Sequence, residues 1–407
     1  MVERKEYIEA LKKWKDEQVI KVVTGLRRCG KSTLLQMYKN ELLNSGASPK
    51  QIVFLNFEDL AFEELLDYRK LYLYVSEKLI PDKMNYIFLD EIQLVPEYQK
   101  TVDSLQLQKN TDIYITGSNA FLLSGELATL LSGRYVEINM LPLSFSEYCA
   151  IKGESDKEKQ FADYMKYGSL PYIATLKDAT EQADIYLEGI YNTIIVKDIE
   201  LRQQRKEKDP NKRRVNDITL LKNISKFLAN SIGSPISIKS ITNYISSNVK
   251  PVSQNTVNDY VQALVEPYLF YPIERYDVIG KNLLKQNCKY YISDLGIRRH
   301  LLPRSRYDLG FSLENLICLE LMRRGYSVNI GKVGAAEVDF VARKGGGTEY
   351  YQVTASMTDE VTFNREISPL RSISDNHPKT ILTLDKLTLG NYDGILVKSA
   401  IDWLTEQ

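Results

Sequence analysis

The segment VVTGLRRCGKSTLL, residues 22–35, matches the pattern G-x-x-x-x-G-K-[ST]. The fixed positions of the pattern are occupied by Gly25, Gly30, Lys31 and Ser32. A short apolar run at 19–23 precedes the pattern and predicts a buried strand. A helical pattern follows, which ends at Gly46 and has on one side Leu34, Leu35, Tyr38 and Leu42. Strand, glycine-containing loop and helix form the setting in which this pattern binds phosphate.

The residue types of the loop suit a nucleoside triphosphate. Gly25 and Gly30 allow the backbone to turn so that successive N–H groups point at phosphate oxygens, and the positive end of the new helix faces the same anion. Lys31 is expected to bridge the β- and γ-phosphates, and the Ser32 hydroxyl to bind Mg²⁺. The nucleotide-binding loop is predicted to comprise Gly25, Leu26, Arg27, Arg28, Cys29, Gly30, Lys31, Ser32 and Thr33. The alternative is a chance match in a glycine turn, which the flanking strand and helix disfavour.

Composition bounds the class of protein. The length of 407 residues predicts two or three domains. Lysine plus arginine equals aspartate plus glutamate at 53 each, so net charge points neither toward nor away from nucleic acid. Four scattered cysteines and two histidines disfavour a metal site built from these residues. The first residues read as an amphipathic helix, and no apolar run approaches the roughly 20 residues of a membrane span, so we expect a cytoplasmic protein without membrane contact.

The segment at 85–91, NYIFLDE, has four apolar positions that lead into Asp90 and Glu91, the form of a Walker B strand. Strand and helix patterns alternate from 19 to about 150, which predicts a parallel sheet covered on both faces. Ligands of such sheets bind at the carboxyl edge. Asp90 is therefore expected to hold Mg²⁺ through water, and Glu91 to orient and deprotonate the attacking water. The alternative is an acidic strand end that faces solvent.

Polar and basic residues after the next strand are candidates for sensing the γ-phosphate. The strand at 112–116 is followed by Ser118 and Asn119, of which Asn119 is our first choice for contact with the γ-phosphate or the lytic water. A helix cap is the alternative role, and both roles are compatible. Arg134 lies just before another strand and is a candidate arginine finger, in cis or from a neighbouring subunit. For Arg134 the alternative is a plain surface arginine.

Four segments, taken in this order and spacing, resemble one family. They are GLRRCGKSTLL at 25–35, FLDEIQ at 88–93, ITGSNAFLLSGELATLLSGR at 115–134 and LPLSFSEY at 141–148. The family is the AAA-superfamily ATPases of bacteria and archaea that carry a C-terminal domain of unknown function. Its motif positions fall on 25–33, Asp90, Glu91, Ser118, Asn119 and Arg134. The resemblance implies ATP rather than GTP as the nucleotide.

The middle of the chain predicts a helical connector followed by a winged helix. Residues 151–200 read as helical, with a G-x-x-P turn at Gly168 that suits a small lid or a structural turn. The stretch LRQQRKEKDPNKRR at 201–214 is a basic connector that either contacts a phosphate backbone or is a solvated linker. Helix, short strand, helix, turn, helix and hairpin at 217–294 predict a winged helix-turn-helix, which the resembled family also carries.

Two roles stay open for this winged helix. Its recognition helix at 254–265 contains no lysine or arginine, which weakens direct base reading. That helix would present Gln254, Asn255, Asn258 and Gln262. Phosphate contacts could still come from Lys250, Arg275, Lys281 and Lys285. Contact with DNA or RNA and a protein-interaction or packing role are therefore equal alternatives.

The C-terminal segment resembles the PD-(D/E)XK restriction-endonuclease fold, in which a helix Glu, a strand Asp and an E-x-K on the next strand bind Mg²⁺. Glu314 and Asp339 stand at the first two positions, but the third reads Gln352-Val353-Thr354. Neutral glutamine is a weak ligand for a hard cation, and threonine cannot replace the lysine that polarises water. We therefore expect a degenerate, inactive site. The alternative for the two acids is structural polarity, such as capping.

These patterns predict an α/β chain of four parts. An AAA-like P-loop ATPase domain spans 1–150, a helical lid with a basic connector 151–214, a winged helix-turn-helix 215–295 and a nuclease-like domain 296–407. We expect Mg²⁺-dependent binding and hydrolysis of ATP that drives or switches the C-terminal domains. One alternative is an ATP-held signalling or scaffold switch with little turnover, and a less favoured one is an ATP-dependent endonuclease. DNA or RNA, a protein partner and further subunits are the macromolecular partners that these functions allow.

Overall fold

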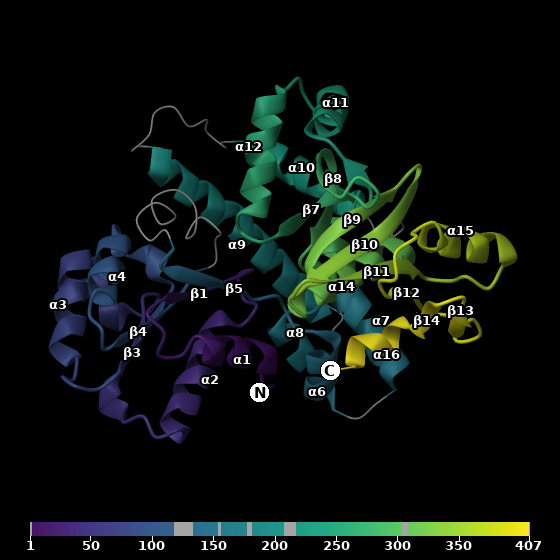
Figure 1. The fold of residues 1–407 in the computed structure, drawn as a ribbon. Coiled ribbons are helices and arrows are strands. Elements are labelled where there is room, and N and C mark those ends of the chain that lie inside the picture. The colour runs from purple at the N-terminus through teal and green to yellow at the C-terminus, as the bar shows by residue number, and fades with distance from the viewer. Residues whose placement is uncertain are drawn as a thin grey trace. The chain divides into compact units, whose positions relative to one another are not determined.

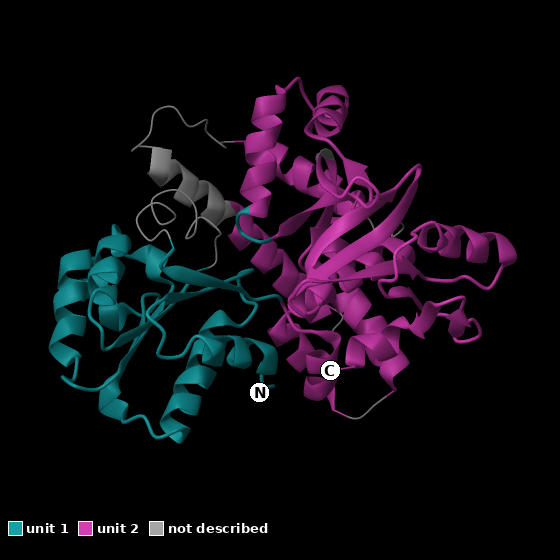
Figure 2. Ribbon diagram, in the orientation of Figure 1, with its two compact units in different colours: residues 1–141, 266–268 teal, residues 142–265, 269–407 magenta. Residues whose placement is uncertain are grey.

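The computed structural model describes residues 2–117, 133–153, 156–176, 181–206, 217–302 and 308–406, with only the backbone described at 196–206 and 285–286. The chain forms two compact units, which Figure 2 distinguishes by colour. Unit 1 comprises Met1–Leu141 and Glu266–Tyr268, and unit 2 comprises Pro142–Val265 and Leu269–Gln407. The sequence placed the first domain boundary at 150, a few residues beyond Leu141, and the further division at 214 and 295 stays a prediction.

Unit 1 is built on a five-stranded parallel sheet in the order β2-β3-β4-β1-β5. Its strands are β1 (Ile20–Thr24), β2 (Ile52–Asn56), β3 (Asn85–Asp90), β4 (Thr111–Thr116) and β5 (Tyr135–Asn139). Strands β1, β3 and β4 are buried over their whole length, because neighbouring strands and helices cover them on all sides. All five strands run in one direction, so their carboxyl ends meet at one edge of the sheet. The predicted α/β architecture of the P-loop NTPases is confirmed in this unit.

Helices cover both faces of this sheet (Figure 1). They are α1 (Lys5–Lys13), α2 (Lys31–Asn44), α3 (Tyr68–Lys78) and α4 (Tyr98–Gln106), with short 3-10 helices η1 (Pro49–Gln51), η2 (Leu60–Leu66) and η3 (Ile92–Leu94). An aliphatic cluster joins one face of the sheet to α3 and α4, and it includes Val22, Leu89, Ile115, Leu71 and Val102. An aromatic stack joins the other face to α2, and it consists of Phe54, Phe88, Tyr114 and Tyr38. Successive side chains of a strand point to opposite faces of the sheet, so the two clusters lie on opposite faces.

The predicted helix after the glycine loop is confirmed. Its expected apolar side is buried on α2, with Leu34, Leu35, Tyr38 and Leu42 at most 2% exposed. The helix ends at Asn44, two residues before Gly46, which adopts a left-handed φ of 98°. Gly46 donates its N–H to the carbonyl of Leu43, an arrangement that closes a helix end where only glycine is unstrained.

Unit 2 is built on a nine-stranded mixed sheet in the order β13-β14-β12-β11-β10-β9-β7-β8-β6. Its strands are β6 (Pro235–Ile236), β7 (Phe270–Asp277), β8 (Asn282–Ile292), β9 (Ser327–Val333), β10 (Ala336–Lys344), β11 (Gly347–Thr354), β12 (Lys379–Thr383), β13 (Gly390–Tyr392) and β14 (Ile395–Ser399). Strand β7 pairs in parallel with β9, which makes the predicted wing hairpin continuous with the strands of the predicted nuclease-like domain. The two predicted domains therefore share one sheet.

The helices of unit 2 flank this sheet. They are α6 (Phe145–Lys152), α7 (Lys157–Tyr167), α8 (Pro171–Thr175), α9 (Glu181–Lys206), α10 (Ile218–Asn230), α11 (Ile238–Asn248), α12 (Gln254–Val265), α13 (Leu295–Leu301), α14 (Leu309–Arg323), α15 (Glu360–Arg371) and α16 (Ala400–Thr405). The order α10, β6, α11, α12, β7, β8 agrees with the predicted sequence of elements at 217–294. The winged-helix and nuclease-like assignments themselves stay predictions.

The G-x-x-P turn packs tightly inside unit 2. Gly168 has a φ of 89°, and a β-carbon there would lie 2.4 Å from Oδ1 of Asp294. The buried Asp294 carboxylate accepts hydrogen bonds from the backbone N–H and the hydroxyl of Ser169 at 2.6 and 2.9 Å. It also caps α13 by accepting from the N–H of Ile297. These contacts favour the structural turn over the lid among the two expected roles.

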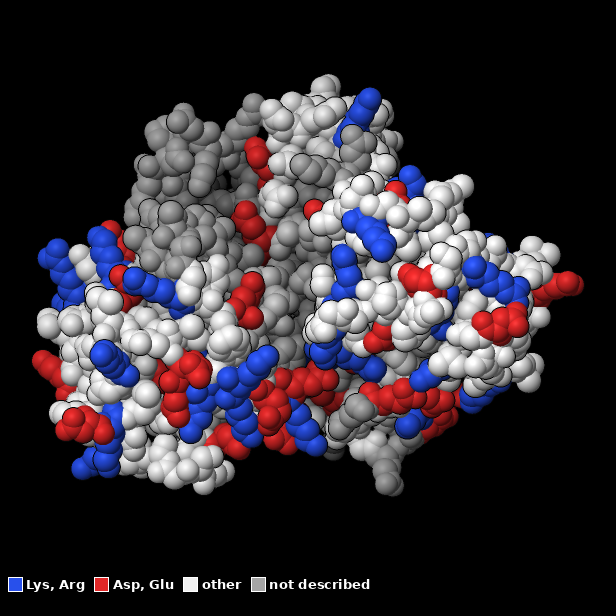
Figure 3. Space-filling view, viewed as in Figure 1, with Lys and Arg blue, Asp and Glu red and all other residues white. Residues whose placement is uncertain are grey.

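Surface charge follows the balanced composition. Figure 3 shows lysine and arginine interspersed with aspartate and glutamate over the face that it draws. Among the described residues drawn there, charges of both signs are mixed, so these residues produce no extended field of a single sign.

Candidate functional site

The glycine loop occupies 25–30, between the carboxyl end of β1 and the start of α2. Gly25 has a φ of 139°, and a β-carbon at this position would lie 2.1 Å from the carbonyl oxygen of Met140. Gly30 has a φ of 108° and occupies the residue before α2. Arg28 between them also adopts a left-handed φ of 66°. The two fixed glycines are thus required by close backbone approach and by backbone conformation.

Replacing Gly25 with alanine is expected to destabilise unit 1. The methyl group collides with the Met140 carbonyl and the backbone φ is strained, so we expect a loss of about 3 kcal/mol in the free energy of unfolding. Chemical denaturation of the full chain measures this loss. Gly46→Ala is the matched control, because a β-carbon there meets no atom within 4 Å although its φ is also positive. Equal stability of the two variants would contradict the packing argument.

The side chain of Lys31 lies against the glycine loop. Its ammonium donates to the carbonyls of Gly25 and Leu26, both at 3.1 Å, and the side chain is 4% exposed. Helix α2 begins at Lys31 without a side-chain cap, so the N–H groups of its first turn have no side-chain acceptor. Uncapped N–H groups, the helix dipole and a lysine at the same point form an anion-binding site. The structure therefore brings the predicted loop residues together in the expected arrangement.

Asp90 ends β3 on the same edge of the sheet. Its Oδ1 accepts a hydrogen bond from the Thr116 hydroxyl at 2.5 Å. Its Oδ2 is buried and has no hydrogen-bond partner among the described residues. Burial raises the pKa of the Asp90 carboxyl, and the hydroxyls of Thr116 and Ser32 partly lower it again. A buried, unsatisfied carboxylate oxygen beside the Ser32 hydroxyl is the kind of oxygen pair that suits Mg²⁺, so these residues fit the expected metal.

Glu91 follows in a left-handed conformation, with a φ of 54°. The conformation turns its side chain away from the path of β3, and its N–H donates to the Thr116 hydroxyl at 2.9 Å. The Gln93 side chain donates to Oε2 of Glu91. Left-handed geometry in a residue other than glycine stores strain and is frequent at functional sites. Glu91 is therefore held by its backbone and by Gln93.

One participant, Thr116, was missed by the sequence analysis. Thr116, the last residue of β4, bridges the ends of β3 and β4 by donating to Asp90 and accepting from Glu91. Its position at the carboxyl end of a predicted buried strand was the available signal. Arg27, expected to contribute its backbone, also forms an ion pair with Glu58 at 2.8 Å, which ties the loop to the segment after β2. Of the remaining loop residues, Leu26 and Cys29 are fully buried.

The expected γ-phosphate sensors have different outcomes. Ser118 and Asn119 lie outside the described residues. Arg134 precedes β5 at the amino edge of the sheet, where its carbonyl accepts from the N–H of Ile20 at 2.8 Å. The length of β1 separates this edge from the glycine loop, roughly 15 Å. Arg134 forms an ion pair with Asp103 of α4 at 2.7 Å, so its guanidinium is directed toward α4 and not toward the loop of its own chain.

The predicted nuclease-like centre is buried in unit 2. Its expected members Glu314, Asp339, Gln352 and Thr354 are between 6 and 9% exposed. The Asp339 N–H donates to Oε1 of Gln352 at 3.3 Å, while Asp339 Oδ2 accepts from the N–H of Val353 at 2.8 Å. The hydroxyl of Thr354 donates instead to the carbonyl of Ser356. Three of the four residues thus converge, and Thr354 does not join them.

An unforeseen lysine occupies this centre. The ammonium of Lys289, from β8, lies 3.0 Å from Glu314, 2.8 Å from Glu337 and 3.9 Å from Asp339. Burial alone would lower the pKa of Lys289, but the surrounding carboxylates outweigh burial and raise it. No group of three or more metal-ligating side chains that could hold an ion occurs among the residues with described positions. An ammonium therefore lies among the carboxylates that a metal ion at this centre would need as ligands.

Comparisons with known proteins agree with the site in unit 1. Residues 17–149 match a family model described as an AAA domain, and 158–308 match a domain of unknown function (DUF8612). An uncharacterized protein of Haemophilus influenzae is 38% identical over 411 residues, which cover 100% of this chain and 99% of the relative. An uncharacterized protein of Methanocaldococcus jannaschii is 30% identical over 86% of this chain and 77% of its own length. The chain belongs to their family, and its N-terminal part is an AAA domain of the P-loop ATPase type.

Solved structures are more distant from this AAA-domain protein. A Walker-type ATPase of Pyrococcus abyssi covers 74% of this chain and 96% of its own, with 15% identity and a TM-score of 0.45. The Aeropyrum pernix ORC1 protein in complex with DNA covers 74% and 92%, with 13% identity and a TM-score of 0.30. No helix within the described segments is both long and apolar enough to span a membrane.

Proposed function

We propose that the AAA domain binds Mg²⁺ and ATP at the glycine loop and hydrolyses the γ-phosphate. The observation that carries the proposal is the meeting of three features at one sheet edge. They are the uncapped start of α2 with Lys31, the unsatisfied Oδ2 of Asp90, and Glu91. Phosphoryl transfer needs little covalent chemistry from a protein, so positioning and charge stabilisation at this edge are sufficient.

Each side chain has a defined task in this mechanism. Lys31 leaves the loop carbonyls to contact the β- and γ-phosphates, and the N–H groups of the loop and α2 bind the phosphate oxygens. Ser32 and Asp90 would hold Mg²⁺, which would neutralise charge on the phosphates when bound. Glu91 accepts a proton from the attacking water. Thr116 keeps Asp90 and Glu91 in register through its two hydrogen bonds.

Arg134 is kept as a proposed arginine finger for a neighbouring subunit. Its side chain is 50% exposed, so its guanidinium has access to solvent despite the pair with Asp103. Exposed ion pairs cost little to break, so the guanidinium is available to a second chain. In this arrangement two or more subunits would share each ATP site. Asn119, or Ser118 in second place, is retained as the proposed polar sensor of the γ-phosphate.

Lys31→Ala tests the proposed function. The substitution removes the charge that contacts the phosphates, so we expect ATP affinity to fall by roughly tenfold or more and hydrolysis to be lost. Calorimetric titration with Mg²⁺ and ATP, together with phosphate release, measures both. Lys50→Ala is the matched control because Lys50 is exposed and lies outside the loop. Unchanged binding and turnover in Lys31→Ala would overturn the assignment.

A second candidate function is a slow ATP-held switch. The segment Glu266–Tyr268, between α12 and β7, belongs to unit 1. The Tyr268 hydroxyl donates to Glu137 at 2.9 Å, and the same carboxylate oxygen accepts from the Thr24 hydroxyl at 2.7 Å. Thr24 directly precedes the glycine loop, so changes in the loop can reach the chain between α12 and β7. Tight binding of ATP with negligible phosphate release from the wild-type chain would favour the switch over turnover.

The macromolecule on which ATP binding or hydrolysis acts stays a proposal. Contact with DNA or RNA by the predicted winged helix, or with a protein partner, is retained. Residues 207–214 of the basic connector lie outside the described residues. Endonuclease activity is disfavoured, because Lys289 fills the acidic centre in place of a metal ion. Stimulation of ATP turnover by DNA, RNA or cell extract would identify the class of partner.

A further inference from the structure

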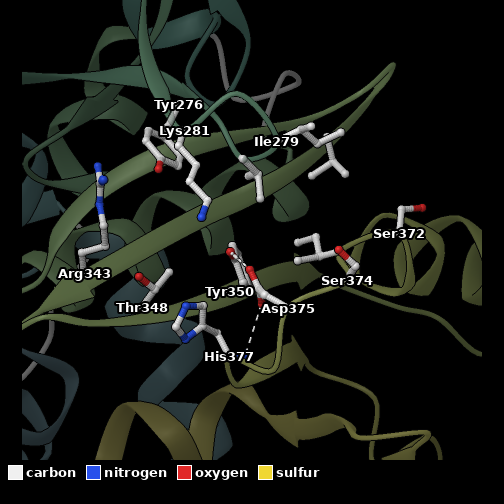
Figure 4. Close-up of a pocket in the computed structure, with 13 residues that line it drawn as sticks. Tyr276, Ile279, Lys281, Arg343, Thr348, Tyr350, Ser372, Ser374, Asp375 and His377 are labelled. Carbon is white, nitrogen blue, oxygen red and sulfur yellow. Dashed lines mark hydrogen bonds between the residues drawn. The ribbon is translucent and has the colours of Figure 1, made fainter.

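Unit 2 contains a cavity of about 500 Å³ that none of the functions above uses. It lies between the turn that joins β7 to β8, the strands β10 and β11, and the loop between α15 and β12 (Figure 4). All of these elements belong to one compact unit. The volume falls in the range of pockets that hold small organic ligands.

The floor of the cavity is apolar and aromatic. Val333, Tyr350 and Ile373 belong to a buried hydrophobic cluster, against which Tyr276 packs. The rings of Tyr350 and His377 lie 6.3 Å apart between centroids. A planar aromatic group entering the cavity would therefore meet ring faces and aliphatic side chains, which favour its transfer from water.

The rim carries two basic side chains, Lys281 and Arg343. Neither Lys281 nor Arg343 forms an ion pair with a described carboxylate. Arg343 is held by a hydrogen bond to Asn329 at 2.6 Å and lies 4.3 Å over the Tyr276 ring, whereas Lys281 extends over the cavity (Figure 4). An oriented guanidinium and a mobile ammonium together suit a phosphate group.

Asp375 is an acidic residue of the cavity lining, and its carboxylate accepts two hydrogen bonds. Asp375 accepts from the Tyr350 hydroxyl at 2.6 Å through Oδ2, and from the His377 N–H at 3.1 Å through Oδ1. Lys379 fixes the same loop by donating to the carbonyls of Ile373 and Asp375. These hydrogen bonds fix the orientation of the carboxylate, which forms no ion pair with Lys281. Side chains of Thr348 and Ser374 add hydroxyl groups that can bind a sugar or a base edge.

We propose that this cavity is a second binding site, for a nucleoside phosphate. The base would lie on the aromatic floor and the phosphate between Lys281 and Arg343. The ligand is either a free mononucleotide or the 5′-phosphorylated end of a single-stranded nucleic acid, which share this chemistry. The lining residues all belong to unit 2, whereas the glycine loop belongs to unit 1.

Calorimetry of the full-length Lys31→Ala chain tests the site, since this background weakens phosphate binding at the glycine loop. The probes are thymidine monophosphate and a 5′-phosphorylated oligothymidylate. We expect millimolar or tighter binding, weakened roughly tenfold by the further substitution Lys281→Ala. Lys226→Ala, at an exposed lysine of α10 outside the cavity, is the matched control and should change nothing. Ser374→Trp, which fills the cavity, should abolish binding.

The two probes separate the two sources of ligand. Tighter binding of the oligonucleotide indicates a nucleic-acid end, and equal affinities indicate a free nucleotide. Absence of heat with both probes at millimolar concentration would overturn the proposal. Binding that Lys281→Ala and Ser374→Trp leave unchanged would overturn it equally, because the ligand would then lie elsewhere.

Discussion

Replacing Glu91 with glutamine is expected to lower the steady-state rate of ATP hydrolysis by roughly 100-fold or more while ATP still binds. Glutamine keeps the shape of the side chain but cannot accept a proton from water. The backbone contact of residue 91 with Thr116 is unaffected, because it uses the N–H. Binding of ATP relies on Lys31, the loop and α2, none of which is changed. A Glu91→Gln chain should therefore retain ATP for much longer than the wild type.

Phosphate release measures ATP hydrolysis and calorimetric titration measures ATP binding, so the two assays on one preparation separate these effects. Glu63→Gln is the matched control, since Glu63 is an exposed glutamate of η2 in the same unit. Full turnover in Glu91→Gln would show that another group takes the proton, and the mechanism above would be wrong. Loss of binding together with turnover would point to a structural role for the carboxylate.

The second large effect concerns Lys289 in unit 2. Lys289→Ala removes the cation from a centre where Glu314 and Asp339 are buried and Glu337 is close. Uncompensated buried charge is costly, so we expect the free energy of unfolding at neutral pH to fall by about 3–5 kcal/mol. Chemical denaturation measures the loss. Lys250→Ala is the matched control: Lys250 pairs with Asp217 at the surface, and its loss should cost little.

The loss in the free energy of unfolding caused by Lys289→Ala should depend on pH in a defined direction. Burial, with Glu314 as a further cause, already raises the pKa of Asp339, and burial raises that of Glu314. Without Lys289 both values rise further, since the lysine is what lowers them. A carboxyl whose pKa is raised on folding destabilises the folded state only while it is charged. The loss in free energy of unfolding therefore shrinks as the pH falls toward the ordinary carboxyl pKa of about 4 and the two carboxyls become protonated. A deficit that grows on acidification would contradict this assignment of charge.

The parts of unit 1 that follow local rules were predictable from the sequence. The glycine loop, the buried side of α2 and the strand ending in Asp90 each follow from residue spacing within one element. Thr116 was missed because its role depends on two strands meeting at one edge, which spacing along the chain does not report. Arg134 was a candidate arginine finger because of its position just before a strand, with a plain surface arginine as the alternative. The parallel pairing of β5 with β1 puts it at the opposite edge.

The acidic centre of unit 2 shows a different limit of prediction from the sequence. Glu337 lies two residues before Asp339 on the same strand face, so its participation could have been inferred from strand periodicity. Lys289 could not, because it comes from β8 in the predicted wing hairpin. Only the shared nine-stranded sheet brings β8 near α14 and β10. Lys289 and the acids that it contacts lie on opposite sides of the predicted boundary at 295, which stays a prediction.

The insertion of Glu266–Tyr268 into unit 1 means that the backbone passes between the units three times. A fragment cut after Leu141 would lack Tyr268 and leave Glu137 without that hydroxyl. Three residues from far downstream in the sequence are therefore part of unit 1, and a fragment that ends at Leu141 would omit them.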